Sequence, residues 1–149
     1  MRENIFKAKR KDNGEWVEGC LIIDYVSGQY FIHQNGNSVN ESPKIGEEGC
    51  LRFLAFEIDP ETICQYTGLT DKNGKKIWEN DIVKCNKRKE GYDLYKVVWR
   101  KDFADFGVEP IKPKFEARYP IGLSECDTIY GYDYKVIGNI FDNPELLGG

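Results

Sequence analysis

The carboxylates with the most obvious chemical potential lie in the stretch QYTGLTDKNGKKIWENDIVKC, residues 65–85. Asp71, Glu79 and Asp81 could perform acid–base catalysis or hold a metal if they converged. Their spacing does not require convergence. An Asp that begins a turn accepts hydrogen bonds from backbone amides just ahead of it, and Asn80–Asp81 is suited to a tight bend. We therefore predict backbone roles for these residues, and we expect no catalytic residues, metal site or cofactor.

A second chemical candidate is the basic segment KCNKRKEGYDLYKVVWRK, residues 84–101. It holds seven basic and two acidic side chains, a local net charge of +5, although the formal net charge of the chain is −4. Cations interleaved with aromatic rings are typical of proteins that bind single-stranded nucleic acid. The candidate nucleic-acid-binding residues are Lys84, Lys87, Arg88, Lys89, Tyr92, Tyr95, Lys96, Arg100 and Lys101. The alternative is a hairpin whose lysines protect a strand edge, and Trp99 is expected in the core.

Cysteine and histidine suggest little chemistry. The five cysteines include no C-x-x-C pair, which argues against a disulfide framework and against a zinc site. We expect them to be reduced and to act as small buried hydrophobes. The single histidine, His33, lies in the strand-like run YFIHQ and is predicted to be structural. The chain contains no GxGxxG, Walker A, HExxH or GxSxG element.

The bulk composition is that of a soluble globular protein. Of 149 residues, 40% are apolar and 31% are charged, which excludes a disordered chain. The longest apolar run, residues 51–56, is short and is interrupted by Arg52, so no membrane span is expected. Basic residues near the N-terminus are not followed by an apolar h-region, and we expect a cytoplasmic location.

The elements that position these residues are predicted to be strands. Aromatic and β-branched residues are frequent, and Gly and Asn recur at turn-like intervals, a pattern typical of a mostly-β chain. Asn13–Gly14 and Asn73–Gly74 suit tight hairpin turns, because both residue types tolerate positive φ. The predicted strands cover residues 5–9, 15–23, 29–34, 62–66, 77–78, 82–83, 94–100, 114–119 and 135–141.

Between these strands the sequence predicts less regular segments. Residues 35–49 indicate a loop, residues 51–58 a strand or a helical turn, and residues 103–113 a long irregular turn. In residues 143–147, NPELL, Asn143 suits a helix cap and the following Pro the first helical position. The two leucines of this turn are expected to close one end of a small barrel.

A domain boundary is predicted near Asp59–Pro60. Residues 1–60 would form an N-terminal β-rich lobe. Residues 61–149 would form a small SH3-like β-barrel with a C-terminal helical turn, because short strands and tight turns fill this part of the chain.

Three blocks of the sequence resemble the YopX-type proteins of phages and prophages in Gram-positive bacteria. They are MRENIFKAKRKDNGEWVEG, DPETICQYTGLTDKNGKKIWENDIVKC and VIGNIFDNPELL. The chain departs from the usual pattern in having Asn80 in place of Gly and Trp78 where Tyr is common. The resemblance implies a small, phage-encoded, mostly-β protein for which self-association is an expectation. It supplies no catalytic residues.

Three functional hypotheses follow. The first is a non-enzymatic phage accessory protein that binds another protein, either a second copy of itself or a host component. The alternative is a nucleic-acid-binding module that uses the basic segment. An enzyme of unrecognised type is the third, and no motif supports it.

Overall fold

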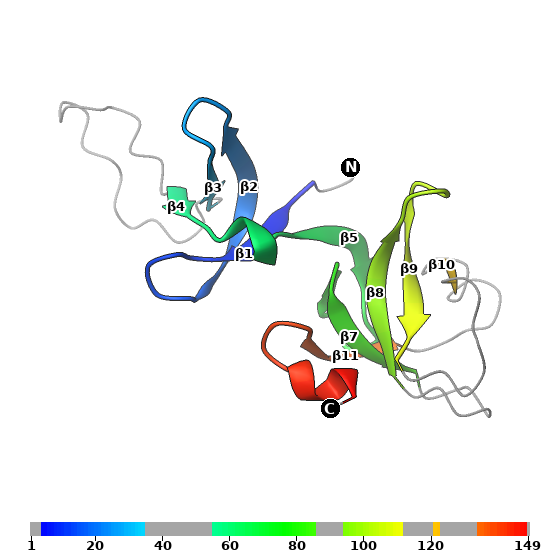
Figure 1. Cartoon of the computed structure of the whole chain (residues 1–149). Helices are drawn as coiled ribbons and strands as arrows, with labels where there is room; N and C mark the ends of the chain where they lie inside the picture. Colours follow the sequence, from blue (N-terminus) through cyan, green and yellow to red (C-terminus); the bar gives the residue numbers. More distant parts are fainter. Residues whose placement is uncertain (1–3, 35–54, 86–93, 112–120, 123–133, 149) are drawn as a thin grey trace. The chain divides into compact units, whose positions relative to one another are not determined.

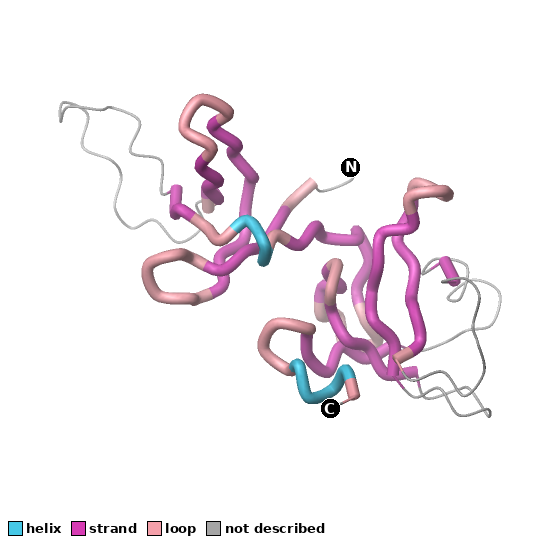
Figure 2. The backbone as a smooth tube through the Cα atoms, viewed as in Figure 1, coloured by secondary structure: helices cyan, strands magenta, loops and turns pink. Residues whose placement is uncertain are grey.

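The computed structural model describes residues 4–34, 55–85, 94–111, 121–122 and 134–148, and these residues form mainly antiparallel strands (Figures 1 and 2). The prediction of a mostly-β chain is confirmed. The strands are β1 (Phe6–Lys9), β2 (Trp16–Asp24), β3 (Gln29–His33), β4 (Ala55–Glu57), β5 (Cys64–Thr70), β6 (Lys76–Trp78), β7 (Asp81–Cys85), β8 (Leu94–Arg100), β9 (Asp105–Pro110), β10 (Ile121–Gly122) and β11 (Tyr134–Asn139). The two short 3-10 helices are η1 (Pro60–Thr62) and η2 (Pro144–Leu147).

The chain divides into two compact units, Met1–Gln65 and Tyr66–Gly149. Strand β5 contributes to both of them. Its first two residues pair with β1, and its later part pairs with β6.

In the first unit the strand order is β4-β3-β2-β1, followed by the start of β5. The turn after β1 contains Gly14, whose φ of +72° explains the Asn–Gly step. One face of the sheet carries the core, which consists of Ala8, Val17, Ile32 and Ile58 with partly buried neighbours Phe6, Leu21, Tyr30, Phe56 and Ile63. At Gly19 a Cβ atom would lie 1.9 Å from the carbonyl oxygen of His33. Only glycine therefore fits where β2 passes this backbone.

In the second unit the strand order is β10-β9-β8-β7-β11. The hairpin of β5 and β6 adds Leu69 and Ile77 to the core of this sheet. The remaining core residues are Val83, Cys85, Tyr95, Val97, Val108, Tyr134 and Val136. Within the described ranges the five strands form an open sheet, because β10 and β11 are not paired with each other.

Several predicted elements differ from the observed ones. Where the sequence predicts an irregular turn over residues 103–113, β9 forms from Asp105 to Pro110 and pairs with β8 along its whole length. The predicted strand at residues 62–66 begins later, because Asp59 caps η1 by accepting a hydrogen bond from the Glu61 amide. The C-terminal helical turn is present as η2. Its Leu147 is exposed, so this leucine does not close a barrel.

Some predictions fall outside the described residues. These include the loop at residues 35–49 and the strand at residues 114–119. Of the segment 51–58, residues 55–58 are described: strand β4 runs from residue 55 to residue 57, and Ile58 forms an isolated bridge with Arg10.

Candidate functional site

Asp71, the first of the candidate acids, is an acceptor for three backbone amides. Its Oδ1 accepts hydrogen bonds from the Asn73 and Lys75 amides, both at 2.9 Å. Its Oδ2 accepts one from the Val136 amide at 3.0 Å. The residue is 7% exposed. Burial favours a higher pKa for this carboxyl, but the three N–H donors and the charge of Lys75 outweigh it and hold the pKa below its ordinary value.

This carboxylate also protects the outer edge of β11. The Val136 amide is satisfied by Asp71, and the Tyr134 carbonyl accepts a hydrogen bond from the Lys72 amide. Two polar groups of an edge strand are thereby occupied by the 71–75 turn, which removes sites for unwanted strand pairing. Gly74, with φ of +80°, closes the turn after Asn73.

Asn80 and Asp81 also form hydrogen bonds with backbone groups. Asn80 has φ of +67°; its amide donates to the Val97 carbonyl and its carbonyl accepts from the Ile140 amide. The Asp81 carboxylate is buried and accepts a hydrogen bond from the Trp78 amide at 2.9 Å. Among the described residues, no group of three or more His, Cys, Asp or Glu side chains is arranged to hold a metal.

Two of the sequence blocks that carry the family resemblance are thus joined by hydrogen bonds, one to a side chain and one between backbone groups. Asp71 and Asn80 belong to the central block, and their partners Val136 and Ile140 belong to the C-terminal block. Within the C-terminal block, Gly138 leaves room for the side chain of Asn143, which accepts a hydrogen bond from the Asn139 amide. These polar residues hold β7, β11 and the following loop together.

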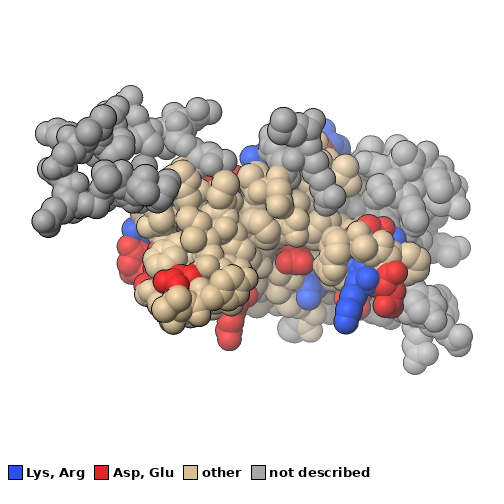
Figure 3. All heavy atoms as spheres, turned by 90° about the horizontal axis from the view of Figure 1, so that it is seen from above, with Lys and Arg blue, Asp and Glu red and all other residues tan. Residues whose placement is uncertain are grey.

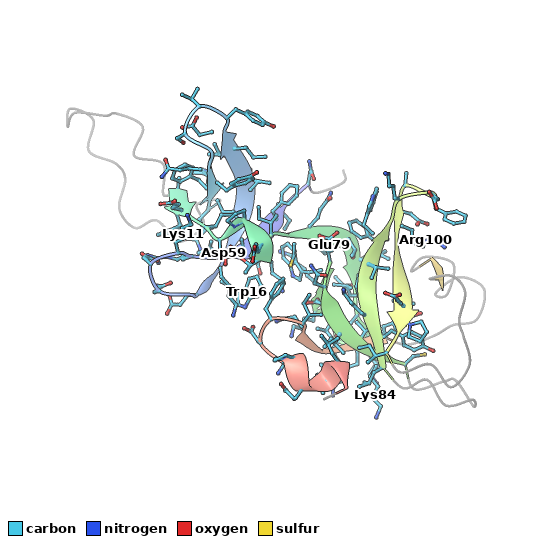
Figure 4. All side chains as sticks on the ribbon, in the orientation of Figure 1. Lys11, Trp16, Asp59, Glu79, Lys84 and Arg100 are labelled. Carbon is cyan, nitrogen blue, oxygen red and sulfur yellow. The ribbon has the colours of Figure 1, made fainter. Side chains whose placement is uncertain are left out.

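The described basic candidates do not all lie at one place. Lys84 pairs in register with Leu94, at the start of β8, whereas Arg100 ends that strand. Six residues of β-strand separate these positions, about 20 Å, and Figure 4 shows Lys84 and Arg100 at opposite ends of the sheet. Lys101 is exposed in the turn beyond Arg100. Lys87, Arg88, Lys89 and Tyr92 lie outside the described residues, and their role stays a prediction.

Two of these candidates are buried, so the predicted role in contacting nucleic acid requires correction. Tyr95 is 2% exposed and contacts Tyr134 edge-on in the core, so its ring cannot stack on a base. Arg100 is 8% exposed, and its Nε donates to Asp105 at 2.6 Å while the Phe103 ring lies 4.3 Å from its guanidinium carbon. The Arg100 guanidinium holds the pKa of Asp105 below its ordinary value.

Trp99 and Cys20 were predicted to be buried, and both are exposed. Trp99 was expected in the core but is 45% exposed, and it packs edge-on against Phe106 with ring centroids 4.9 Å apart. Cys64 and Cys85 are buried as predicted, whereas Cys20 is exposed on the outer face of β2. The remaining cysteines, Cys50 and Cys126, lie outside the described residues. His33 lies opposite Cys20 in β3.

Sequence reasoning missed two exposed features. Lys135 is exposed on β11 directly opposite Lys84 on β7; the alternation of polar and apolar residues in KVIGN gave a signal for its outward position. Tyr25 and Val26 are the most exposed of the large apolar side chains described, at 88% and 98%. The turn-forming residues around them were the sequence feature that indicated an exposed position.

The charged side chains of the described surface are mixed in sign. Acidic and basic groups are interspersed on the face shown in Figure 3. No helix among the described residues has the length and apolar character that a membrane crossing requires.

Comparison with known proteins relates the chain to one family. The model of the family described as YopX protein matches residues 5–148. The chain is also similar to the crystal structure of protein EF1440 from Enterococcus faecalis, with 24% sequence identity, a TM-score of 0.52 and coverage of 99% of each chain. At this level of identity the likeness concerns the fold alone. None of the curated proteins matches the sequence. Because the family model covers nearly the whole chain, this protein belongs to the YopX family.

Proposed function

We propose that this protein is a non-catalytic β binding module of a phage or prophage, and that it acts by contacts with another protein, either a second copy or a host component. The observation that carries the proposal is the turn between β2 and β3 (Figure 1), where Tyr25 and Val26 are exposed to solvent almost completely. Tyrosine is among the residues that contribute most to protein interfaces, because its ring buries a large area at low entropic cost.

The turn that bears these side chains is fixed by Asp24. Its Oδ1 accepts hydrogen bonds from the Val26 and Ser27 amides at 2.9 and 3.3 Å, and its Oδ2 accepts one from the Ser27 hydroxyl at 2.7 Å. The Ser27 hydroxyl and these amides hold the pKa of Asp24 below its ordinary value, so the carboxylate is ionised near neutral pH. Gly28, at φ of +72°, completes the turn with a hydrogen bond to the Asp24 carbonyl.

A fixed turn favours binding, because little conformational entropy remains to be lost when a partner orders the tip. Ile22, in β2 of the same hairpin, is also exposed, at 40%. Three of the described acids, Asp24, Asp71 and Asp81, accept hydrogen bonds from backbone amides, which supports a structural role for these three over a catalytic one.

We further infer from the family that the protein works in the cytoplasm of a bacterial host and that it self-associates. An SH3-like barrel for residues 61–149 belongs to the same proposal. The packing of the β5–β6 hairpin on the core of the second unit's five-stranded sheet supports it.

The experiment compares three forms of the full chain: wild type, the double variant Tyr25→Ser with Val26→Ser, and the matched control Phe103→Ser. Phe103 is also an exposed apolar residue in a hairpin turn, in the second unit. Sedimentation velocity over a range of concentrations measures self-association, and affinity purification from the bacterial host detects other partners.

We expect the wild type and Phe103→Ser to associate, and the tip variant to lose association at least tenfold, without a change in its circular dichroism spectrum. Loss of association in Phe103→Ser alone would move the contact to the second unit and refute the role of the tip. A wild-type chain that is monomeric at every concentration and purifies without a partner would refute the proposed function.

A further inference from the structure

Three lysines lie on one face of the second unit's sheet, opposite its core. Lys84 on β7 is paired in register with Lys135 on β11 and with Leu94 on β8. Lys96 lies two residues along β8 from Leu94, and side chains two residues apart in a strand point to the same face. Lys84 and Lys135 are exposed. Lys96 is partly exposed, and Ile82, which is paired with it on the same face, is buried.

The burial of the neighbouring residues establishes this orientation. On the three strands, the residues that alternate with the lysines are buried in the core: Val83, Cys85, Tyr95, Val97, Tyr134 and Val136. The three ammonium groups therefore project from the other face. We refer to Lys84, Lys96 and Lys135 together as the lysine face.

The pairing of Lys84 with Lys135 is unfavourable in the free protein. Like charges directly opposite each other on adjacent antiparallel strands repel, because their Cβ atoms are only about 5 Å apart. The ion pairs between described residues do not include either lysine. Glu109 lies opposite Lys96 on β9, which leaves the Lys84–Lys135 pair as the more strongly cationic end. A bound anion would remove this repulsion.

We propose that the lysine face binds the phosphodiester backbone of a double-stranded nucleic acid. Lysines neutralise phosphates without reading bases, so the binding is independent of sequence. Single-strand binders add aromatic platforms. None of the described residues that share this face on β7, β8 and β11 is aromatic, and Trp99 lies on the opposite face with Phe106. This proposal is independent of protein binding by the hairpin tip.

The test measures fluorescence anisotropy of a labelled DNA duplex of about 20 base pairs, and of a single strand of the same length, between about 50 and 200 mM salt. The wild-type chain is compared with the variant Lys84→Gln, Lys96→Gln, Lys135→Gln. The matched control is Lys11→Gln, Lys72→Gln, Lys75→Gln, which removes the same charge from three exposed lysines elsewhere. Circular dichroism checks the fold of each variant.

Three phosphate contacts predict a slope of about −2.7 for log affinity against log salt concentration, which is about a 40-fold loss of affinity over this range. We expect the lysine-face variant to bind at least tenfold more weakly at the lower salt concentration and to lose this part of the slope, while the control keeps both. Duplex binding at least as tight as single-strand binding would support the proposal. It would be overturned by a lysine-face variant with wild-type affinity and slope, by a wild-type chain that does not bind the duplex, or by tighter binding of the single strand.

Discussion

Replacing Asp71 with Asn tests whether this carboxylate stabilises the fold. Asn has nearly the same shape, and its single oxygen can still accept from the Asn73 and Lys75 amides. Its NH₂ group would face the Val136 amide, which now donates to Oδ2 at 3.0 Å. Two donors would then meet where one hydrogen bond exists, and the two remaining bonds would lose the contribution of the negative charge.

The magnitude follows from these three bonds. A buried N–H left unsatisfied costs about 1–3 kcal/mol, and a hydrogen bond to a charged acceptor contributes roughly 1 kcal/mol more than one to a neutral acceptor. We expect Asp71→Asn to lower the free energy of unfolding of the second unit by about 3 kcal/mol, a large part of the roughly 5–15 kcal/mol typical of a domain.

The loss must also depend on pH. The pKa of Asp71 in the folded protein lies below the ordinary value of 3.8, so its stabilising effect is fully present above that value and disappears as the pH falls through the folded pKa. The difference between wild type and Asp71→Asn should therefore be largest near neutral pH and should shrink below about pH 4.

Urea unfolding monitored by tryptophan fluorescence and by circular dichroism measures this difference. Trp78 is buried against Tyr66 in the second unit, and agreement of the two signals tests for a two-state transition. Asp102→Asn, an exposed change of the same charge in the same unit, should leave the transition unchanged. A loss below about 1 kcal/mol at neutral pH, or a difference that does not vary with pH, would refute a stabilising role for the ionised carboxylate.

Three further substitutions test other close contacts, each by urea unfolding. Gly19→Ala should lower the free energy of unfolding by about 3 kcal/mol, because its Cβ would lie 1.9 Å from the His33 carbonyl oxygen. The control Gly14→Ala, with open space around the Cβ but φ of +72°, should lower it by only about 1 kcal/mol. Equal losses from the two substitutions would contradict the close contact at Gly19. Gly138→Ala would place its Cβ 2.3 Å from Oδ1 of Asn143. The loss of unfolding free energy that it causes should therefore be smaller in an Asn143→Ala background. Strictly additive losses would show that the two residues do not interact. Asp105→Asn should cost about 1–2 kcal/mol by weakening the partly exposed ion pair with the buried Arg100, and no change in the midpoint would show that the pair contributes nothing.

The parts of the fold that depend on neighbouring residues were predictable from sequence. Alternation and turn residues predicted β1, β2, β3 and β8 closely, and Asp71 was expected to accept from backbone amides near it in sequence. Its third bond, to Val136, joins residues 65 positions apart, a distance over which a local pattern carries no information.

The errors have the same origin. Strand β9 contains Gly107 and Pro110, which locally favour a turn, yet pairing with β8 imposes a strand. Arg100 was predicted to contact a phosphate. The same pairing places Asp105 opposite Arg100, and the two side chains are joined by a hydrogen bond. Likewise the proximity of Lys84 to Lys135 depends on the register of two strands that are distant in sequence.

The most direct test of the proposed function places a photo-crosslinking amino acid at position 25 of the full chain expressed in the bacterial host, with the same substitution at position 11 as a control. Tyr25 is at the proposed contact, and Lys11 is an exposed residue of the same unit in a different turn. The proposal predicts a discrete adduct after irradiation from position 25 only, with twice the mass of the chain for self-association or another single mass for a host protein. No adduct from position 25, or the same adducts from both positions, would contradict it.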